Sequence, residues 1–451
     1  MITNYITMKY KTIIVVSFLF CITTINARDS KFTQKGTGPM YWIAYEYCIE
    51  NDIAIPEERW QKNIDWINEN FKEYGYDMIS NDGWIEAAQT INANGFITKY
   101  NSQWENGFKY WNNYIHNKGM KAGIYYNPLW MTRTAFSTNC PVIGTNVFAQ
   151  DIAGEHSFNS ELHWVDVEKK GAEQWIKGYV RYFINLGFIY LRIDFLENYE
   201  THYGTEKYAQ ALKWIAEEAG DEIFLSLVMP NCYNNSETEL KYGDMIRISD
   251  DCWDGGWNFV SDRKRGIVNI RWPRYWNVFD GFISFSDIAA KGQMIMDGDF
   301  MRMNTMNTIE EKQFLFSLMC ITGSAICIAD QFDTIDDECI EIYTNKELLE
   351  LNKVGFAAKP ISNDIYDNIN STRWIGKLPD GDWVIGLFNR EDYSIESGIN
   401  FTTELGIKSG TVENIRDLWE HKDLGSIADK YIVTLKPRSC KVIRIKVVIS
   451  H

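Results

Sequence analysis

The chain has 451 residues, of which 45% are hydrophobic, so it is long enough to bury a large core and to form more than one domain. Its formal net charge is -16 and no segment is rich in Lys and Arg. This argues against nucleic acid or an anionic membrane surface as a partner, because both require clustered positive charge. Aromatic residues make up 15% of the chain, and since sugar-binding clefts pack aromatic rings on pyranose faces, carbohydrate is a candidate ligand.

The N-terminus has the pattern of a secretory signal peptide. Lys9 and Lys11 precede a short apolar run at 12–20, and the segment ends on the small residue Ala27. The run is too short to cross about 30 Å of hydrocarbon, so no membrane span is expected. Cys21 lacks the small residue expected before a lipidated cysteine, which disfavours a lipoprotein. The sequence therefore predicts a signal peptide at residues 1–27 and a secreted or periplasmic protein.

Residues 28–360 alternate short apolar runs with amphipathic stretches. Helical spacing of apolar residues occurs, for example, at 60–74, 104–115 and 208–215. Eight strands that alternate with helices over some 300 residues predict a (β/α)8 TIM barrel. The expected strands lie at 40–45, 76–80, 121–126, 189–194, 223–228, 245–249, 293–296 and 324–329.

The pattern changes after Asn352. A loop-like stretch at 353–370 leads into strand-like runs at 374–376, 383–388, 431–435 and 442–445, with turn signals such as Asp380-Gly381-Asp382 between them. Residues 361–451 are therefore predicted to form a small C-terminal antiparallel β-sandwich domain.

Carboxylates follow several of the predicted barrel strands, where a TIM barrel places its functional side chains. Any one of them suits a helix cap or an Asx turn. Together they repel one another, so the cluster favours chemistry or ligand binding. A Ca²⁺ or Mg²⁺ site is a rival interpretation, but Arg192 and Arg247 would compete with a cation at the same rim. The residues concerned are Asp82, Asp194, Asp250, Asp251, Asp297 and Asp299, with Asn81 beside the first.

Glycoside cleavage needs two such carboxyl groups. One attacks the anomeric carbon, and the other protonates the departing oxygen and then activates water. Arg192 lies two residues before Asp194, so its side chain should point to the same side of the strand and help to keep Asp194 ionised.

Several segments resemble glycoside hydrolase family 27, the α-galactosidases and α-N-acetylgalactosaminidases. They are 38–42, 344–347, 386–390 and the run 416–425, in the family's order along the chain. The resemblance implies a (β/α)8 barrel followed by a β domain, and a retaining mechanism without cofactor or metal. It implies Asp194 as nucleophile and Asp251 as acid/base, because the family's acid/base follows an Arg by four residues, here Arg247. The substrate-binding residues that it implies are Tyr45, Asn81, Asp82, Trp84, Arg192, Arg247, Asp297 and Asp299.

The sugar-reading positions depart from this pattern. Asn81 replaces an acidic residue, Arg192 replaces a Lys, and the strand at 223–228 lacks the Glu that holds O2. Residues 127–161 form a longer loop than usual, expected to overhang the cleft. The leading prediction is hydrolysis of terminal α-linked galactose on oligosaccharides or polysaccharides. The alternatives are a β-L-arabinopyranoside, an α-N-acetylgalactosaminide, an α-glucan, or a carbohydrate-binding protein without catalysis.

Overall fold

The computed structural model describes residues 27–82, 90–230, 236–261, 275–289, 291–408 and 412–448. The predicted signal peptide lies outside these ranges except for Ala27, and Trp84 lies outside them as well. Among the residues described, no helix is both long and apolar enough to span a membrane.

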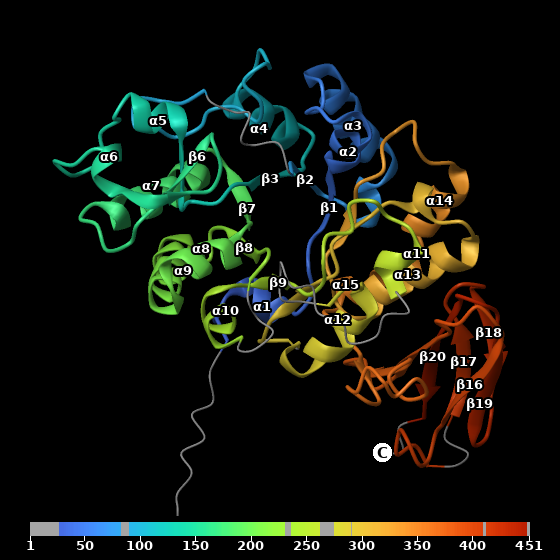
Figure 1. The fold of residues 1–451 in the computed structure, drawn as a ribbon. Coiled ribbons are helices and arrows are strands. Elements are labelled where there is room, and N and C mark those ends of the chain that lie inside the picture. The colour runs from blue at the N-terminus through green and yellow to red at the C-terminus, as the bar shows by residue number, and fades with distance from the viewer. Residues whose placement is uncertain are drawn as a thin grey trace, which may run out of the picture.

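A parallel sheet of nine strands forms the centre of the molecule (Figure 1). Its order is β10-β9-β8-β7-β3-β2-β1-β12-β11, and every neighbouring pair runs parallel. The predicted (β/α)8 barrel is confirmed, and all eight predicted strands are present. The strands are β1 (Met40–Ile43), β2 (Met78–Ser80), β3 (Lys121–Tyr125), β7 (Phe188–Ile193), β8 (Phe224–Leu227), β9 (Met245–Arg247), β10 (Ile295–Asp297), β11 (Phe300–Met301) and β12 (Ile326–Ile328).

The seventh barrel position is occupied by two short strands, β10 and β11, with a bend between them. A Cβ atom at Gly298 would lie 2.6 Å from Met319 Sδ and 2.7 Å from Phe282 Cζ, so a larger residue there would have to displace these buried side chains. Asp299 follows with φ +69°, a conformation that L-residues rarely adopt. β10 pairs with β9 and β11 pairs with β12. The bend therefore links the two ends of the sheet and presents Asp297 and Asp299 on either side of Gly298.

Strand alternation separates an inner from an outer core. Tyr41 and Tyr190 belong to a cluster inside the barrel, where their hydroxyl oxygens lie 3.2 Å apart. Trp42 and Leu191, one position further along each strand, pack in the larger cluster beneath the helices. Arg192 therefore lies on the inner side, as the period of two requires.

Helices surround the sheet. The apolar positions Trp60, Ile64 and Ile67 lie on α3, and those at 208–215 lie on α9, as predicted. α3 ends at Asn70, so Phe71 and Tyr74 of the predicted helix lie beyond it, in its C-cap and in a short 3-10 turn, and α4 begins only at Phe108. The predicted helical stretch at 104–115 was therefore wrong at its start, because Trp104 lies in the preceding loop, where its Nε1 donates to Ile55 O at 2.9 Å. The helices are α1 (Lys31–Lys35), α2 (Tyr45–Asn51), α3 (Glu57–Asn70), α4 (Phe108–Asn117), α7 (Ala172–Asn185), α8 (Leu196–Tyr203), α9 (Thr205–Ala219), α10 (Glu237–Tyr242), α11 (Trp257–Ser261), α12 (Val278–Phe285), α13 (Ile309–Ile321), α14 (Asp337–Tyr343) and α15 (Lys346–Lys353).

The long segment between β3 and β7 folds into a small subdomain at the upper left of Figure 1. Its three strands form an antiparallel sheet in the order β4-β6-β5. Its elements are β4 (Trp130–Thr132), α5 (Arg133–Ser137), α6 (Ala149–Ile152), β5 (Ala153–Ser157) and β6 (Leu162–Val165).

The C-terminal residues form two antiparallel sheets, shown in red in Figure 1, which confirms the predicted β-sandwich domain. One sheet has the order β13-β14-β15-β20-β17-β18, and the other pairs β16 with β19. The strands are β13 (Lys359–Pro360), β14 (Arg373–Lys377), β15 (Trp383–Phe388), β16 (Ile395–Asn400), β17 (Val412–Asp417), β18 (Lys422–Gly425), β19 (Lys430–Leu435) and β20 (Cys440–Val447).

A buried arginine joins this domain to the barrel. Arg390 follows β15 and donates to Asp280 Oδ1 at 2.7 Å and to Asn277 Oδ1 at 3.3 Å. Its guanidinium also lies 4.4 Å from the centre of the Phe279 ring. Because these partners lie on or at the start of α12, the β domain is fixed against the barrel wall.

Candidate active site

Asp194 follows β7 and is held by three neighbours. Tyr125 Oη donates to Asp194 Oδ2 at 2.9 Å, and the Phe195 backbone N–H donates to Oδ1 at 2.6 Å. Asn127 Nδ2 donates to the Asp194 carbonyl at 2.8 Å. Burial and the charge of Asp251 raise the pKa of Asp194, while Arg192 opposes this shift. Arg192 therefore favours the ionised carboxylate, as expected, but burial and Asp251 outweigh it.

Asp251 lies four residues beyond Arg247, at the end of β9. Arg247 Nη2 donates to Asp251 Oδ1 at 2.8 Å, and the Asp251 side chain keeps 24% of its surface exposed. Asp250 is more deeply buried, and its carbonyl accepts from Arg247 at 3.2 Å. The charge of Asp251 raises the pKa of Asp194, so the two carboxyl groups lie near each other at this rim.

Two buried arginines bind the remaining carboxylates. Arg192 is paired with Asp82 at 3.0 Å, with Asp297 at 3.0 Å and with Asp299 at 3.2 Å. Arg247 is paired with Asp299 at 2.5 Å as well as with Asp251. Asp299 therefore bridges the two guanidinium groups, and its second oxygen also accepts the Cys252 backbone N–H at 2.8 Å.

Burial raises the pKa of Asp82 to about 8, against the opposing effect of Arg192. Burial likewise raises the pKa of Asp299 to about 6, although both arginines oppose it. Burial therefore favours the protonated form of Asp82, and its ion pair with Arg192 favours the ionised form.

The other predicted binding residues are buried or packed against neighbouring side chains. Asn81 is fully buried, and its Oδ1 accepts the backbone N–H of Tyr125 at 3.0 Å, so it helps to position the tyrosine that contacts Asp194. Asp297 and Asp299 are also buried, at 0% and 1% exposure, and act on the cleft through the arginines. Tyr45 packs edge-on against Phe300, with ring centres 5.0 Å apart.

Burial raises the pKa of Tyr45, and the charges of Asp82, Asp251, Asp299 and Asp194 raise it further. Tyr45 therefore lies at the same rim as the carboxylates. Of the predicted site residues, only Trp84 falls outside the described part of the chain.

Aromatic side chains pack together next to Asp194. Phe195 has φ +59°, and Met229 at the end of β8 has φ +49°, both unusual for residues with a Cβ atom. Such backbone strain concentrates at functional sites. The Phe195 ring packs against Phe158 of the subdomain at 4.4 Å and against Trp130 at 6.1 Å between ring centres. The long loop predicted to overhang the cleft thus contacts the residue next to Asp194.

A third buried arginine, Arg302, holds the loop that follows Asp251. Arg302 Nη1 donates to the Trp253 carbonyl at 2.6 Å. Thr305 Oγ1 accepts the Gly256 backbone N–H at 2.8 Å and donates to the Arg302 carbonyl at 2.6 Å. Arg302 is in turn paired with Glu50 and lies 3.7 Å from Glu46, which is fully buried.

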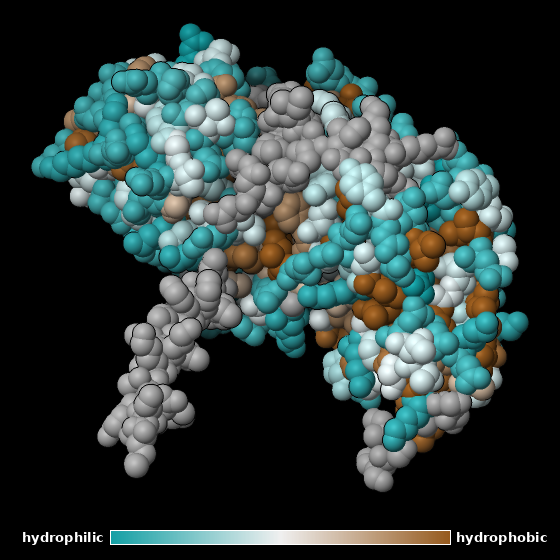
Figure 2. Space-filling model, turned by 60° about the horizontal axis from the view of Figure 1, so that its bottom comes forward, coloured by the Kyte–Doolittle hydropathy of each residue, from teal (hydrophilic) through white to brown (hydrophobic). Residues whose placement is uncertain are grey.

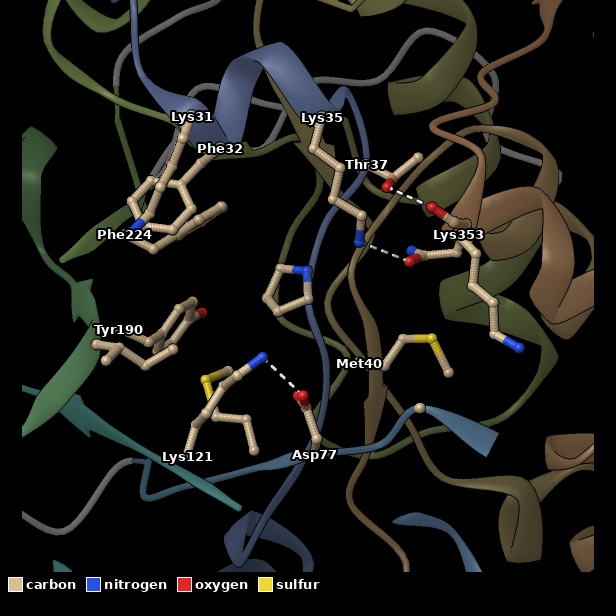
Figure 3. A pocket seen from close by; sticks show the side chains of 15 residues that line it. Lys31, Phe32, Lys35, Thr37, Met40, Asp77, Lys121, Tyr190, Phe224 and Lys353 are labelled. Carbon is tan, nitrogen blue, oxygen red and sulfur yellow. Dashed lines mark hydrogen bonds and ion pairs between the residues drawn. The ribbon is translucent and has the colours of Figure 1, made fainter. Parts of the chain in front are cut away.

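A cavity of about 250 Å³ lies at the opposite, N-terminal end of the barrel (Figure 3). It is lined by α1 and by the starts of several barrel strands. Lys121 is paired there with Asp77 at 2.6 Å, and Lys35 donates to Asn352 Oδ1 at 2.9 Å. None of the carboxylates at the C-terminal rim lines this cavity, which separates it from the candidate active site.

Several of the rim carboxylates are paired with arginine side chains. Within the described ranges, no group of three or more His, Cys, Asp and Glu side chains is arranged to hold a metal ion. Asp82, Asp297 and Asp299 are paired with Arg192, and Asp251 and Asp299 are paired with Arg247.

The sequence of this chain matches known protein families and relatives. The family model described as alpha galactosidase A matches residues 37–158, and the alpha galactosidase C-terminal beta sandwich domain matches residues 370–445. An isomalto-dextranase of Arthrobacter globiformis is 39% identical, covering 93% of this chain and 69% of the relative. The chain belongs to glycoside hydrolase family 27.

Solved structures agree with this assignment. The A. globiformis isomalto-dextranase complexed with panose has a TM-score of 0.89 over 94% of this chain and 74% of its own. A family 27 β-L-arabinopyranosidase from Geobacillus stearothermophilus has a TM-score of 0.75 over 94% of this chain and 99% of its own, but at 19% identity it shows the fold alone. α-Galactosidase 2 of Arabidopsis thaliana is 23% identical over 89% of this chain and 88% of its own.

Three parts of this family 27 site were missed by sequence reasoning. Tyr125 closes β3, so inspection of every strand end would have found it. Phe158 and Arg302 reach the site only through the tertiary fold, and no local spacing indicates them.

Proposed function

We propose that this family 27 chain is a retaining exo-glycosidase that acts on an α-glucan of the dextran type. The observation that carries the proposal is the 39% identity along 93% of the chain to a relative named isomalto-dextranase. The α-galactosidases among the relatives reach only 21–23% identity. The α-glucan was one of the alternatives left open by the sequence, and it now ranks above terminal α-galactose.

The binding shell supports this ranking. Glucose and galactose differ only in the direction of the hydroxyl at C4, so the residues around that hydroxyl decide between them. Asn81 stands where the resemblance implies an acidic residue, and its Oδ1 accepts the Tyr125 N–H, so that oxygen is not offered to a sugar hydroxyl. Arg192 is paired with three carboxylates, so its guanidinium group cannot easily move to bind the hydroxyls of a different sugar. A hydroxyl buried without its partner costs about 1–3 kcal/mol, enough to change sugar preference ten- to a hundredfold.

The geometry supports a double displacement. Tyr125 and the Phe195 N–H orient the Asp194 carboxylate for attack on the anomeric carbon, while Asp251 protonates the departing oxygen. The glycosyl ester removes the negative charge of Asp194. The ionised Asp251 then takes a proton from the incoming water, which attacks the anomeric carbon and releases Asp194. The partial exposure of Asp251 suits a group that meets both the leaving group and water.

We also propose that residues 1–27 direct export, which would bring the enzyme to a polymer too large to enter a cell. N-terminal sequencing of the protein recovered from outside the cytoplasm tests this directly, and a start at residue 28 is expected.

A substrate panel tests the proposed specificity. Dextran and the nitrophenyl glycosides of α-isomaltose, α-glucose, α-galactose, β-L-arabinopyranose and α-N-acetylgalactosamine are incubated with the enzyme, and with Asp194→Asn as the inactive control. We expect short saccharides from dextran and turnover of an α-glucoside. Preferential cleavage of the α-galactoside, with dextran untouched, would contradict the glucan assignment.

A further inference from the structure

The β domain carries a groove of about 490 Å³ along β16, lined also by residues of β19 and of the segment that leads into β14. Three large hydrophobic side chains that line it are strongly exposed: Ile369 at 72%, Tyr393 at 63% and Ile432 at 45%. Figure 2 shows hydrophobic patches interrupting the surface of this domain at the lower right. Exposed apolar side chains gathered in one groove with a polar rim mark an interaction site.

The groove is held in place before anything binds. Asn389 is fully buried, and its Nδ2 donates to the carbonyls of Tyr393 at 2.8 Å and Lys436 at 2.7 Å, which fixes the loop that carries the tyrosine. On the other side, Arg373 Nη1 donates to Gly398 O at 3.0 Å and to Glu404 Oε1 at 2.6 Å. A ligand would therefore meet a preformed surface and order little of it.

The charges of the groove select the kind of occupant. Glu391, Glu396 and Glu404 line it together with Arg373 and Lys430, so carboxylates slightly outnumber cations. Anionic polymers are therefore unfavourable. A second copy of the chain, itself carrying a net charge of -16, is disfavoured for the same reason. An uncharged polysaccharide meets no such repulsion, and its C–H faces and hydroxyls match the apolar side chains and the polar rim.

We propose that this groove is a second α-glucan-binding site, separate from the catalytic cleft; the choice of polymer rests on the proposed function. An exo-acting enzyme holds only the chain end in its cleft. A second contact on the same polymer raises the effective concentration of ends, so the groove aids long substrates and leaves short ones unaffected.

Two variants test the groove, Tyr393→Ala and Ile369→Ser, each exposed enough to change without loss of the fold. Tyr110→Ala is the matched control, because Tyr110 is 47% exposed on α4, away from this domain. Retention in gels containing dextran is measured in the Asp194→Asn background. We expect Tyr393→Ala to weaken dextran binding about three- to tenfold, with the control unchanged.

Kinetics with Asp194 intact separate the groove from the cleft. The KM for dextran should rise by a similar factor, while kcat/KM for a nitrophenyl glycoside stays constant. Unchanged dextran binding and KM would overturn the proposal, as would a change in oligomeric state caused by Tyr393→Ala, measured by sedimentation. Failure of the wild type to hydrolyse dextran would instead count against the proposed function, since gel retention does not require turnover.

Discussion

The clamp formed by Arg302 on the Asp251 loop makes a quantitative prediction for Arg302→Met. The substitution keeps most of the side-chain volume and removes the hydrogen bond to the Trp253 carbonyl, which lies two residues beyond Asp251. A hydrogen bond to a charged group contributes about 1.5–3 kcal/mol. Each 1.36 kcal/mol added to the activation barrier slows a reaction about tenfold. If the whole energy of this hydrogen bond is lost from the transition state for protonation of the leaving group, the rate falls roughly 10- to 150-fold.

Substrates with different leaving groups show whether Arg302→Met slows the protonation of the departing oxygen. A sugar alkoxide needs a proton to depart, whereas a nitrophenolate leaves with little help. For Arg302→Met we therefore expect kcat/KM to fall by this factor on dextran and by less than about threefold on a nitrophenyl glycoside. The assays are run well below the unfolding temperature, because the buried Glu46 loses a neighbouring charge.

Two matched variants calibrate the result. Glu50→Gln changes the exposed partner of Arg302, whose side chain is 58% accessible, and should have little effect. Thr305→Val removes the acceptor for the Gly256 N–H and should give a smaller loss with the same leaving-group dependence. Equal losses on both substrates, or full dextran activity in Arg302→Met, would refute the idea that the clamp positions the acid/base.

Three further predictions concern two residues of the site and Asp330, a fully buried residue two positions beyond β12 that accepts the Met303 N–H and the Tyr343 hydroxyl. Asp251→Ala should lose dextran hydrolysis but cleave a nitrophenyl glycoside, with azide restoring turnover as a glycosyl azide of retained configuration; absence of rescue would argue against Asp251. Phe158→Ala removes the ring contact with Phe195 and should raise the KM for dextran roughly 2- to 10-fold; an unchanged KM would separate the subdomain from the cleft. Burial and the Glu46 charge raise the pKa of Asp330 to about 7, so the folded state retains a proton that the unfolded chain loses above about pH 4. Stability from this group is therefore lost as pH rises from 4 to 7, and Asp330→Asn should flatten the profile of unfolding temperature over that range; a profile parallel to the wild type would contradict it.

The sequence was sufficient for the barrel because its signals are local. Apolar runs of strand length recur between helical patterns, and the parallel pairing follows from that alternation. The strand-end rule also brought Asp194, Asp251 and Arg247 to one rim, where the structure places them. Short-range spacing was a poorer guide at 104–115, where Trp104 has helical spacing but lies in a loop.

The ionic network could not be derived from spacing. Asp297 and Asp299 lie more than a hundred residues from Arg192, and they reach it only because the sheet closes at Gly298. Arg192 was expected to help keep Asp194 ionised and to bind substrate. Three other carboxylates share its guanidinium, and burial decides the direction of the pKa shift at Asp194.

Covalent trapping tests the central claim, that Asp194 is the nucleophile of a retaining reaction. The enzyme is incubated with an activated fluorinated glycosyl fluoride of the sugar that it cleaves, digested, and mapped by mass spectrometry. The predicted result is one added sugar on the peptide that contains Asp194, and no label in Asp194→Asn. A label on another carboxylate, or hydrolysis with inversion and no trapped sugar, would contradict the account.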